Sequence, residues 1–153
     1  MSLADNALLT AHRDGLVRHG FIRSDAVRNF AAQTISEYGV KAGGPDAAAR
    51  SLSGGNLQKF IVGREIRQKP RVMIAAQPTW GVDVGAAAQI RQALLDLRDA
   101  GVAILVVSEE LDELFEICDR LAVIAQGRLS WPKPVRDTNA EEIGLLMSAS
   151  GAA

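Results

Sequence analysis

The chain has 153 residues, of which 48% are hydrophobic and 23% are charged, and its formal net charge at pH 7 is −1. This length supports one domain with a core of its own, and the near-neutral charge gives no general attraction to nucleic acid or to an anionic membrane. The single cysteine excludes an internal disulfide, which fits a reducing compartment, and no apolar run approaches the roughly 20 residues needed to span a bilayer.

The first part of the chain is predicted to be mostly helical. Residues 5–10 favour a short helix, and a longer helix is predicted to begin at Ser24 and to stop at Gly39, because its apolar side chains recur at helical spacing. A loop at 42–50 containing glycines and a proline then leads into residues 52–59 (LSGGNLQK), which we call the Ser-Gly-Gly segment.

The Ser-Gly-Gly segment is predicted to open a helix from about Gly54 to Gln68, with Ser53 as its N-cap. Gly54 and Gly55 leave the first turn without side chains, and the exposed N–H groups of such a turn can bind an anion such as phosphate. An ordinary turn before a core helix explains the same residues, and short motifs often arise for that reason. Both interpretations stay open from the local chemistry.

From residue 70 onward the pattern alternates between strands and helices, which indicates an α/β sheet with crossovers. The apolar runs 72–76 and 102–107 predict two buried parallel strands, joined by a helix. A third strand is predicted at 121–125, turning at Gln126 and Gly127 into a short hairpin. A last helix follows a proline-containing linker.

This pattern divides the chain into three parts. We expect a helical subdomain at 1–69, an α/β core at 70–131, and a linker with the C-terminal helix at 132–153. In α/β sheets, ligands bind at the carboxyl ends of the strands. Those ends carry residues 76–79 (AQPT) and Ser108-Glu109, so these two places and the Ser53 helix start are the candidate sites.

Four segments, in this order and spacing, resemble the ATPase domains of ABC transporters. LSGGN at 52–56 resembles the signature motif, and VMIAAQPT at 72–79 is similar to the Walker B strand and its turn. GVDVGA at 81–86 resembles the D-loop, and VSEEL at 107–111 stands in the place of the switch-histidine loop. The resemblance covers about residues 10 to 130 and is nearest to the second ATPase half of the double-headed proteins that serve sugar and nucleoside importers.

The resemblance implies an α/β fold that is part of a P-loop NTPase core. No G-x-x-x-x-G-K-[ST] phosphate loop occurs in the sequence, so the chain resembles the C-terminal part of such a domain, with the Walker A strand missing. That strand would lie between 102–107 and 121–125, and its absence leaves open sheet edges. We therefore expect 72–76 and 102–107 to be parallel neighbours. We also expect either that 121–125 pairs with 102–107 or that another chain fills the gap, with a homo-oligomer through these edges as one possibility.

Three catalytic positions depart from the ABC pattern. Ala76 stands where the Walker B Asp helps to hold Mg²⁺, and a methyl group cannot do this. Gln77 replaces the catalytic Glu, and a neutral amide can orient a water but cannot take its proton. Glu109 replaces the switch His and would add like charge near a phosphate. Gln77 and Glu109 are therefore degenerate catalytic positions, and no residue is predicted to ligate a metal.

The resemblance also implies a nucleotide site shared with a partner. ABC ATPases work in pairs, with each ATP between the Walker side of one domain and the signature of the other. The residues implied to contact nucleotide or to couple the two sites are Ser53, Gly54, Gly55, Asn56 and Asp83. We expect a partner ATPase half and membrane permease subunits at the cytoplasmic face of the membrane. ATP and Mg²⁺ are expected for the full-length protein and neither for this chain alone, which should lack activity.

Two other functions fit the motifs. One is a non-transport ABC protein that acts on ribosomes or DNA, but the near-neutral charge and the lack of a basic or aromatic strip argue against nucleic acid as a partner. The other is a dimerisation module that has lost nucleotide chemistry. Nucleotide-dependent pairing with a domain that carries an intact phosphate loop would separate the importer subunit from this module.

Overall fold

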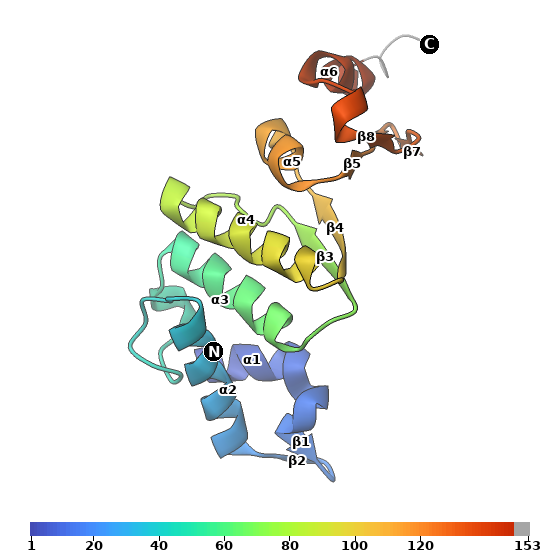
Figure 1. Ribbon diagram of the computed structural model, residues 1–153. Coiled ribbons are helices and arrows are strands. Elements are labelled where there is room, and N and C mark those ends of the chain that lie inside the picture. The colour runs from blue at the N-terminus through green and yellow to red at the C-terminus, as the bar shows by residue number, and fades with distance from the viewer. Residues whose placement is uncertain (149–153) are drawn as a thin grey trace. The chain divides into compact units, whose positions relative to one another are not determined.

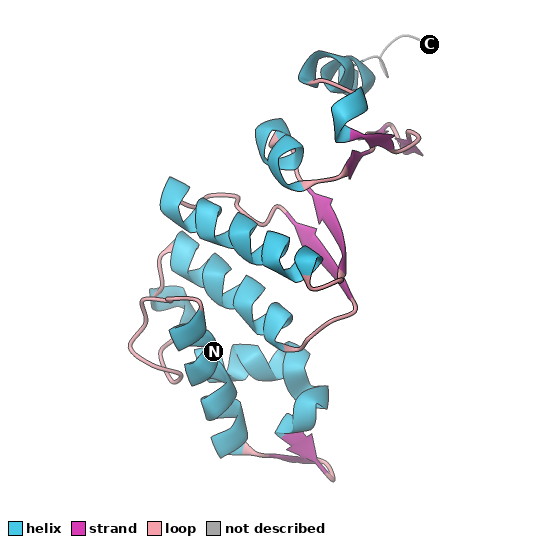
Figure 2. Cartoon of the chain, viewed as in Figure 1, coloured by secondary structure: helices cyan, strands magenta, loops and turns pink. Residues whose placement is uncertain are grey.

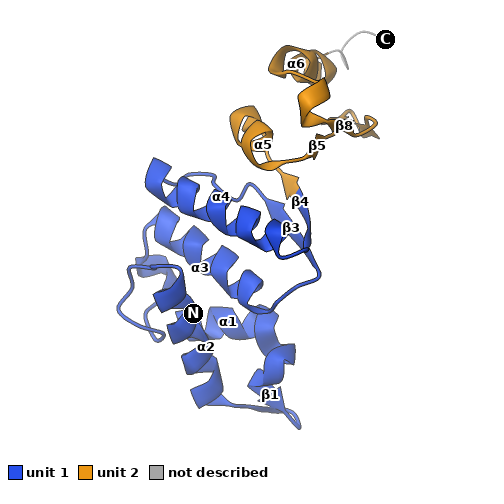
Figure 3. Cartoon of the chain, viewed as in Figure 1, with its two compact units in different colours: residues 1–105 blue, residues 106–153 orange. Residues whose placement is uncertain are grey.

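The computed structural model describes residues 1–148, which form two compact units. The first unit runs from Met1 to Leu105 and the second begins at Val106 (Figure 3). Each unit is described by itself. In the described part of the chain, no helix combines the length and the apolar character that crossing a bilayer requires.

The amino-terminal helices of the first unit confirm the sequence prediction. Helix α1 (Leu3–Ala11) leads through the π-type turn η1 (His12–Leu16) and the short strands β1 (Val17–Arg18) and β2 (Phe21–Ile22) to helix α2 (Ser24–Glu37) (Figure 1). Gly39, at φ 58°, ends α2, and the Val40 N–H donates to the Ile35 carbonyl at 2.9 Å, which is the Schellman pattern. These helices share one core with Phe60 of the next helix. Its buried members are Leu3, Ala4, Ala7, Ala11, Leu16, Val27, Ala31, Val40 and Phe60.

Helix α3 (Gly54–Arg67) follows the 3₁₀ turn η2 (Ala49–Ser51) and packs against α1, α2 and α4. Its Gly63 is buried under the ring of Tyr38, the residue that caps the end of α2. A Cβ atom at residue 63 would overlap that ring. The missing side chain therefore lets the end of α2 pack closely on α3.

Strands β3 (Val72–Ala76) and β4 (Ala103–Val107) are neighbours in one sheet and point the same way (Figure 2). Helix α4 (Val84–Asp99) connects them and packs beside α3. At the start of the pair, the Ala103 N–H donates to the Arg71 carbonyl at 3.2 Å. The prediction of parallel neighbours is confirmed.

The prediction that these strands are buried holds for one face of β3 only. Met73 and Ala75 are each 7% exposed, whereas Val72 and Ile74, which point to the other face, are 64% and 69% exposed. Leu105 of β4 is 54% exposed. A strand with apolar residues on both faces is typical of a sheet covered on both sides. In the part of the chain that the structure describes, β3 has its cover on one side.

Up to residue 148, the second unit contains helix α5 (Leu111–Ile117), four two-residue strands, the 3₁₀ turn η3 (Val135–Asp137) and helix α6 (Ala140–Ser148). Strands β6 (Ile124–Ala125) and β7 (Arg128–Leu129) form the predicted hairpin, and β5 (Arg120–Leu121) pairs with β8 (Lys133–Pro134). A small core of Leu121, Val123 and Ile143 joins these elements.

The predicted strand 121–125 is broken into β5 and β6, which is a correction of the sequence analysis. Between them, the Val123 N–H donates to the Ser130 side chain at 2.9 Å rather than to a strand backbone. Among the described residues, neither β5 nor β6 pairs with β4, so the expected move of 121–125 onto 102–107 does not occur. The backbone groups of β5 and β6 instead bond to β8 and β7, which follow soon afterwards in the chain. The alternative, another chain in the gap, stays a prediction.

Candidate functional site

The start of α3 carries the Ser-Gly-Gly segment. Ser53 has an extended backbone (φ −64°, ψ 157°), and its carbonyl accepts the first helical bond, from the Leu57 N–H at 2.9 Å. Ser53 is thus the N-cap, as predicted, but its hydroxyl does not bond to a helix amide. In the described part of the chain no side chain caps this first turn. The N–H groups of the turn therefore keep the capacity to bind an external anion.

The Ser53 hydroxyl is instead bound by a side chain from one turn further along the helix. Asn56 Nδ2 donates to Ser53 Oγ at 2.9 Å, and Asn56 Oδ1 accepts from the Lys41 N–H at 2.8 Å. Sequence reasoning placed Asn56 among the nucleotide-contacting residues but missed this bridge, because Lys41 lies in the loop before the helix. Ser53 remains exposed.

The two glycines of the segment face the loop that precedes α4. A Cβ atom at residue 54 would lie 3.1 Å from the Gly81 carbonyl oxygen, and one at residue 55 would lie 3.0 Å from Ala86 Cβ. Gly55 is buried and Gly54 is exposed. Close packing is therefore one physical reason for these glycines, alongside the anion site, and both interpretations of the motif apply to the same turn.

Asp83 lies in this contact and is brought next to the Ser-Gly-Gly segment. Its Oδ1 caps α4 by accepting from the Ala86 N–H at 2.9 Å, and its Oδ2 would lie 3.2 Å from a Cβ atom at residue 55. The structure thus joins two of the sequence motifs, 52–59 and 81–86, into one packed surface. The capping role of Asp83 is a function of that residue that the motif resemblance did not indicate.

The turn after β3 is tied to the same helix. Gln77 adopts a left-handed backbone (φ 48°), and its carbonyl accepts from the Trp80 N–H at 3.2 Å. Gln58 of α3 reaches the carbonyls of Gln77 and Pro78 with its Nε2 atom, at 3.4 and 3.3 Å. The third motif, residues 72–79, therefore ends beside the helix that the Ser-Gly-Gly segment opens.

Glu109 belongs to the second unit, in the loop before α5, where its side chain is exposed. Glu110 is the N-cap of α5, and Ser108 Oγ accepts from the Glu110 N–H at 3.1 Å. The same Ser108 hydroxyl donates to Glu113 Oε2 at 3.0 Å. Glu113 is only 4% exposed, and among the described residues its Oε1 has no partner. The local sequence pattern carries no sign of this burial, because Glu113 lies in the first turn of α5, where an acidic residue is usually exposed.

Mg²⁺, which the ABC resemblance implies, does not fit the residues present. Mg²⁺ requires oxygen ligands in octahedral geometry, of which carboxylates are the usual protein source. The end of β3 offers the methyl group of Ala76 and the amide of Gln77. Among residues 1–148 no three His, Cys, Asp or Glu side chains lie close enough together to hold a metal ion.

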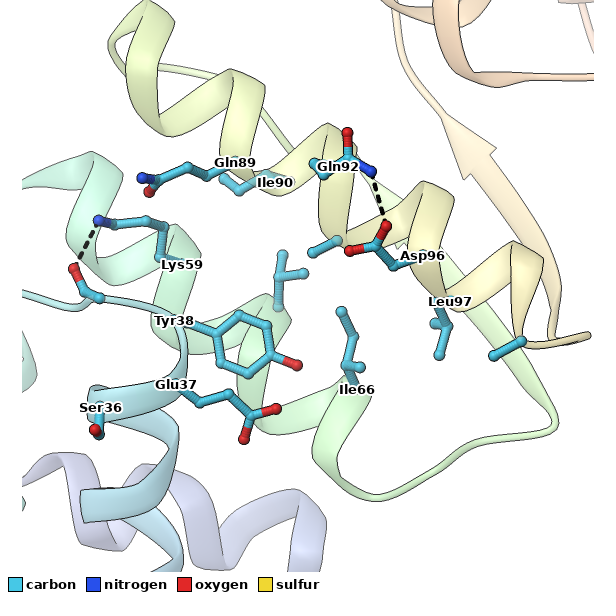
Figure 4. A pocket seen from close by; sticks show the side chains of 14 residues that line it. Ser36, Glu37, Tyr38, Lys59, Ile66, Gln89, Ile90, Gln92, Asp96 and Leu97 are labelled. Carbon is cyan, nitrogen blue, oxygen red and sulfur yellow. Dashed lines mark hydrogen bonds between the residues drawn. The ribbon is translucent and has the colours of Figure 1, made fainter.

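A cavity in the first unit borders Lys59, the last residue of the Ser-Gly-Gly segment, but no other residue of the four motifs. It has a volume of about 710 Å³ and is bounded by the end of α2, by α3 and by α4 (Figure 4). Tyr38 points into it, and Lys59 Nζ donates to the Gly39 carbonyl at 2.9 Å on its wall. Burial raises the pKa of the Tyr38 phenol, with a smaller contribution from Glu37. None of the predicted site residues lines this cavity.

Known proteins similar to this chain agree with the motif pattern. The chain matches no family model. It is 40% identical over 148 residues to the nucleoside import ATP-binding protein NupA of Lactococcus lactis, which covers 96% of this chain and 29% of NupA. It is 44% identical over 131 residues to the guanosine import ATP-binding protein NupO of Bacillus subtilis, covering 86% of this chain and 26% of NupO. The chain therefore spans less than a third of these curated relatives.

Solved structures share the fold. The dimeric ATP-binding cassette MJ0796 bound to ADP and Pi superposes with a TM-score of 0.72 at 20% identity, covering 89% of this chain and 57% of the cassette. An ATP-binding subunit of an ABC transporter gives 0.73 at 17% identity, covering 97% of this chain and 62% of that subunit. The signature-like start of α3, the motif order and the identity to importer ATP-binding proteins lead to one assignment: the chain belongs to the ATP-binding proteins of ABC transporters.

Proposed function

We propose that this chain is part of the ATP-binding subunit of an ABC importer for simple sugars or nucleosides. In this role it donates residues 52–56 (LSGGN), the first part of the Ser-Gly-Gly segment, to ATP that a partner ATPase half holds on its own phosphate loop. The observation that carries the proposal is the start of α3, where Ser53 is exposed and no described side chain caps the first turn. The import functions named for NupA and NupO support the transported class.

The chemistry of this donated site is electrostatic. The first turn of α3 offers uncapped N–H groups at the positive end of a 14-residue helix, and Ser53 adds a hydroxyl. Such donors stabilise the charge on the terminal phosphate, and that charge is redistributed as the phosphate is transferred to water. This chain supplies binding and orientation, and the phosphate loop of the partner half supplies the rest of the cradle.

The second nucleotide site, built on this chain's own Ala76, Gln77 and Glu109, hydrolyses poorly in this proposal. The Gln77 amide can orient a water but cannot accept its proton, and Glu109 brings negative charge toward a phosphate. The full-length protein uses ATP and Mg²⁺ at its competent site, and the isolated chain is inactive. Asp83, packed against Gly55, couples the two sites.

The wider architecture follows the same proposal. Residues 1–69 act as the helical subdomain, 70–131 as the C-terminal half of the ATPase core, and 132–153 as a linker and last helix. The partners are a second ATPase half and the membrane permease subunits, at the cytoplasmic face of the membrane.

Steady-state ATP turnover of the full-length ATPase that carries these residues tests the proposal. Ser53→Arg places a bulky cation in the donor site and should abolish turnover, a loss of at least about 100-fold. Gln77→Ala should leave most of the turnover, because the second nucleotide site, to which Gln77 belongs, contributes little to ATP hydrolysis. Equal damage from both variants would refute the asymmetry. Pairing with the partner half that does not depend on ATP would favour the dimerisation module instead.

A further inference from the structure

The side chain of Asn56 connects two parts of the chain that meet at the start of α3. Its Oδ1 accepts from the Lys41 N–H at 2.8 Å, and its Nδ2 donates to Ser53 Oγ at 2.9 Å. Lys41 lies in the loop between α2 and the Ser-Gly-Gly segment, 15 residues before Asn56. The bridge therefore fixes the Ser53 hydroxyl relative to the backbone of the preceding loop.

The chemistry of the bridge sets the direction of each bond. A backbone N–H is a donor only, so the atom of Asn56 that faces Lys41 must be the amide oxygen. The amide nitrogen then faces Ser53, and the Ser53 oxygen must accept. The proton of the Ser53 hydroxyl is not used in this bond, and the hydroxyl does not accept from a helix amide either. That proton can therefore be donated outward.

We propose that Asn56 is a positioning residue that holds the Ser53 hydroxyl as a donor toward the phosphate of bound ATP. This inference rests on the proposed function. A phosphate oxygen without a proton can only accept, so a hydroxyl turned inward as a donor gives it nothing. Asn56 keeps the hydroxyl in the useful orientation by occupying its acceptor side with an N–H group.

A purely structural role for Asn56 makes a different prediction. If the bridge only holds the loop against α3, its loss should lower kcat/KM by the same factor whether or not residue 53 has a hydroxyl. The bond from Lys59 Nζ to the Gly39 carbonyl, 2.9 Å long, ties the same helix to the same loop without touching Ser53. Lys59→Met is therefore a matched control for the loss of one hydrogen bond between α3 and this loop.

Two substitutions at Asn56 distinguish reversing the direction of its hydrogen bond with Ser53 from losing both of its hydrogen bonds. Asn56→Asp is nearly isosteric and keeps an acceptor for the Lys41 N–H, but its carboxylate makes Ser53 donate inward. Asn56→Leu removes both bonds. Each is made in the full-length ATPase with Ser53 and again with Ser53→Ala, and kcat and KM for ATP are measured. Because the introduced carboxylate is present in both backgrounds, the comparison cancels its direct repulsion of ATP.

With Ser53 present, both Asn56 variants should lower kcat/KM about tenfold, the size expected for one hydrogen bond. With Ser53→Ala, neither should add a further loss, and Lys59→Met should have little effect in either background. Equal losses from the Asn56 variants in both backgrounds, or no loss at all, would overturn the positioning role while Ser53→Ala still lowers turnover. If Ser53→Ala itself leaves turnover unchanged, the proposed function fails and the inference fails with it.

Discussion

Gly55 of α3 lies so close to Asp83 that a Cβ atom at residue 55 would stand 3.2 Å from Asp83 Oδ2. The same Cβ would meet Ala86 Cβ at 3.0 Å, and Asp83 cannot move freely because it caps α4. Gly55→Ala should therefore destabilise the chain by about 1–3 kcal/mol, the usual cost of forcing a methyl group into a packed contact.

Urea unfolding of the chain measures this cost. Gly43→Ala is the control, because residue 43 is exposed and a Cβ there would meet nothing within 4 Å. Its unfolding free energy should change by no more than about 0.5 kcal/mol. Equal stability of the two variants would show that the motif glycine at 55 is not required for packing.

A second close approach joins Gly63 of α3 to Tyr38 at the end of α2. Since a Cβ at residue 63 would overlap the Tyr38 ring, Gly63→Ala should destabilise the chain by about 1–3 kcal/mol. Shortening the partner should relieve the clash, so Gly63→Ala should cost less in a Tyr38→Ala background than in the parent chain. Thermal unfolding of the four chains of this cycle measures the coupling. Additive effects would contradict the contact.

Local pattern predicted the helices of this chain but not the contacts that define its site. The apolar spacing between Ser24 and Gly39 was enough to place α2, and a Ser before two glycines was enough to place the start of α3. The Asn56 bridge to Lys41 and the approach of Gly55 to Asp83 depend on loops that only the tertiary fold brings together. Periodicity carries no signal for such contacts.

The predicted strands also differ from the structure where tertiary contacts, rather than local composition, decide the outcome. The run 121–125 is apolar and continuous, yet it divides at Val123, because the Ser130 side chain takes the bond that a neighbouring strand would make. The run 72–76 has the composition of a strand covered on both faces, although the described chain covers one. Composition indicates the environment for which a strand is suited, which is not always the environment that this chain provides.

Titration of the chain's single tyrosine tests the burial of Tyr38 directly. Burial raises the pKa of its phenol, so the absorbance change of the folded chain should have its midpoint above the ordinary value of about 10. Denaturant should return the midpoint to that value. A folded midpoint at or below the ordinary value would contradict the half-buried position of the ring.

The raised pKa also fixes the sign of a stability effect. The unfolded chain loses the Tyr38 proton more readily than the folded chain, so the contribution of Tyr38 is fully present below about pH 10. It is lost as the pH rises through the folded pKa. Tyr38→Phe cannot ionise, and its unfolding free energy should therefore fall less between about pH 9 and pH 11 than that of the parent chain.

The two faces of β3 should respond in opposite ways to charge. Ile74 is 69% exposed, so Ile74→Lys should change the unfolding free energy by no more than about 0.5 kcal/mol. Met73, its neighbour on the strand, is 7% exposed, and Met73→Lys should be severely destabilising because it buries an unpaired charge. Ile74→Lys combined with Leu105→Lys should also lower the fluorescence of the dye ANS bound to the folded chain, since both remove exposed apolar surface. If Ile74→Lys instead unfolds the chain while Met73→Lys does not, the assignment of the covered face is wrong.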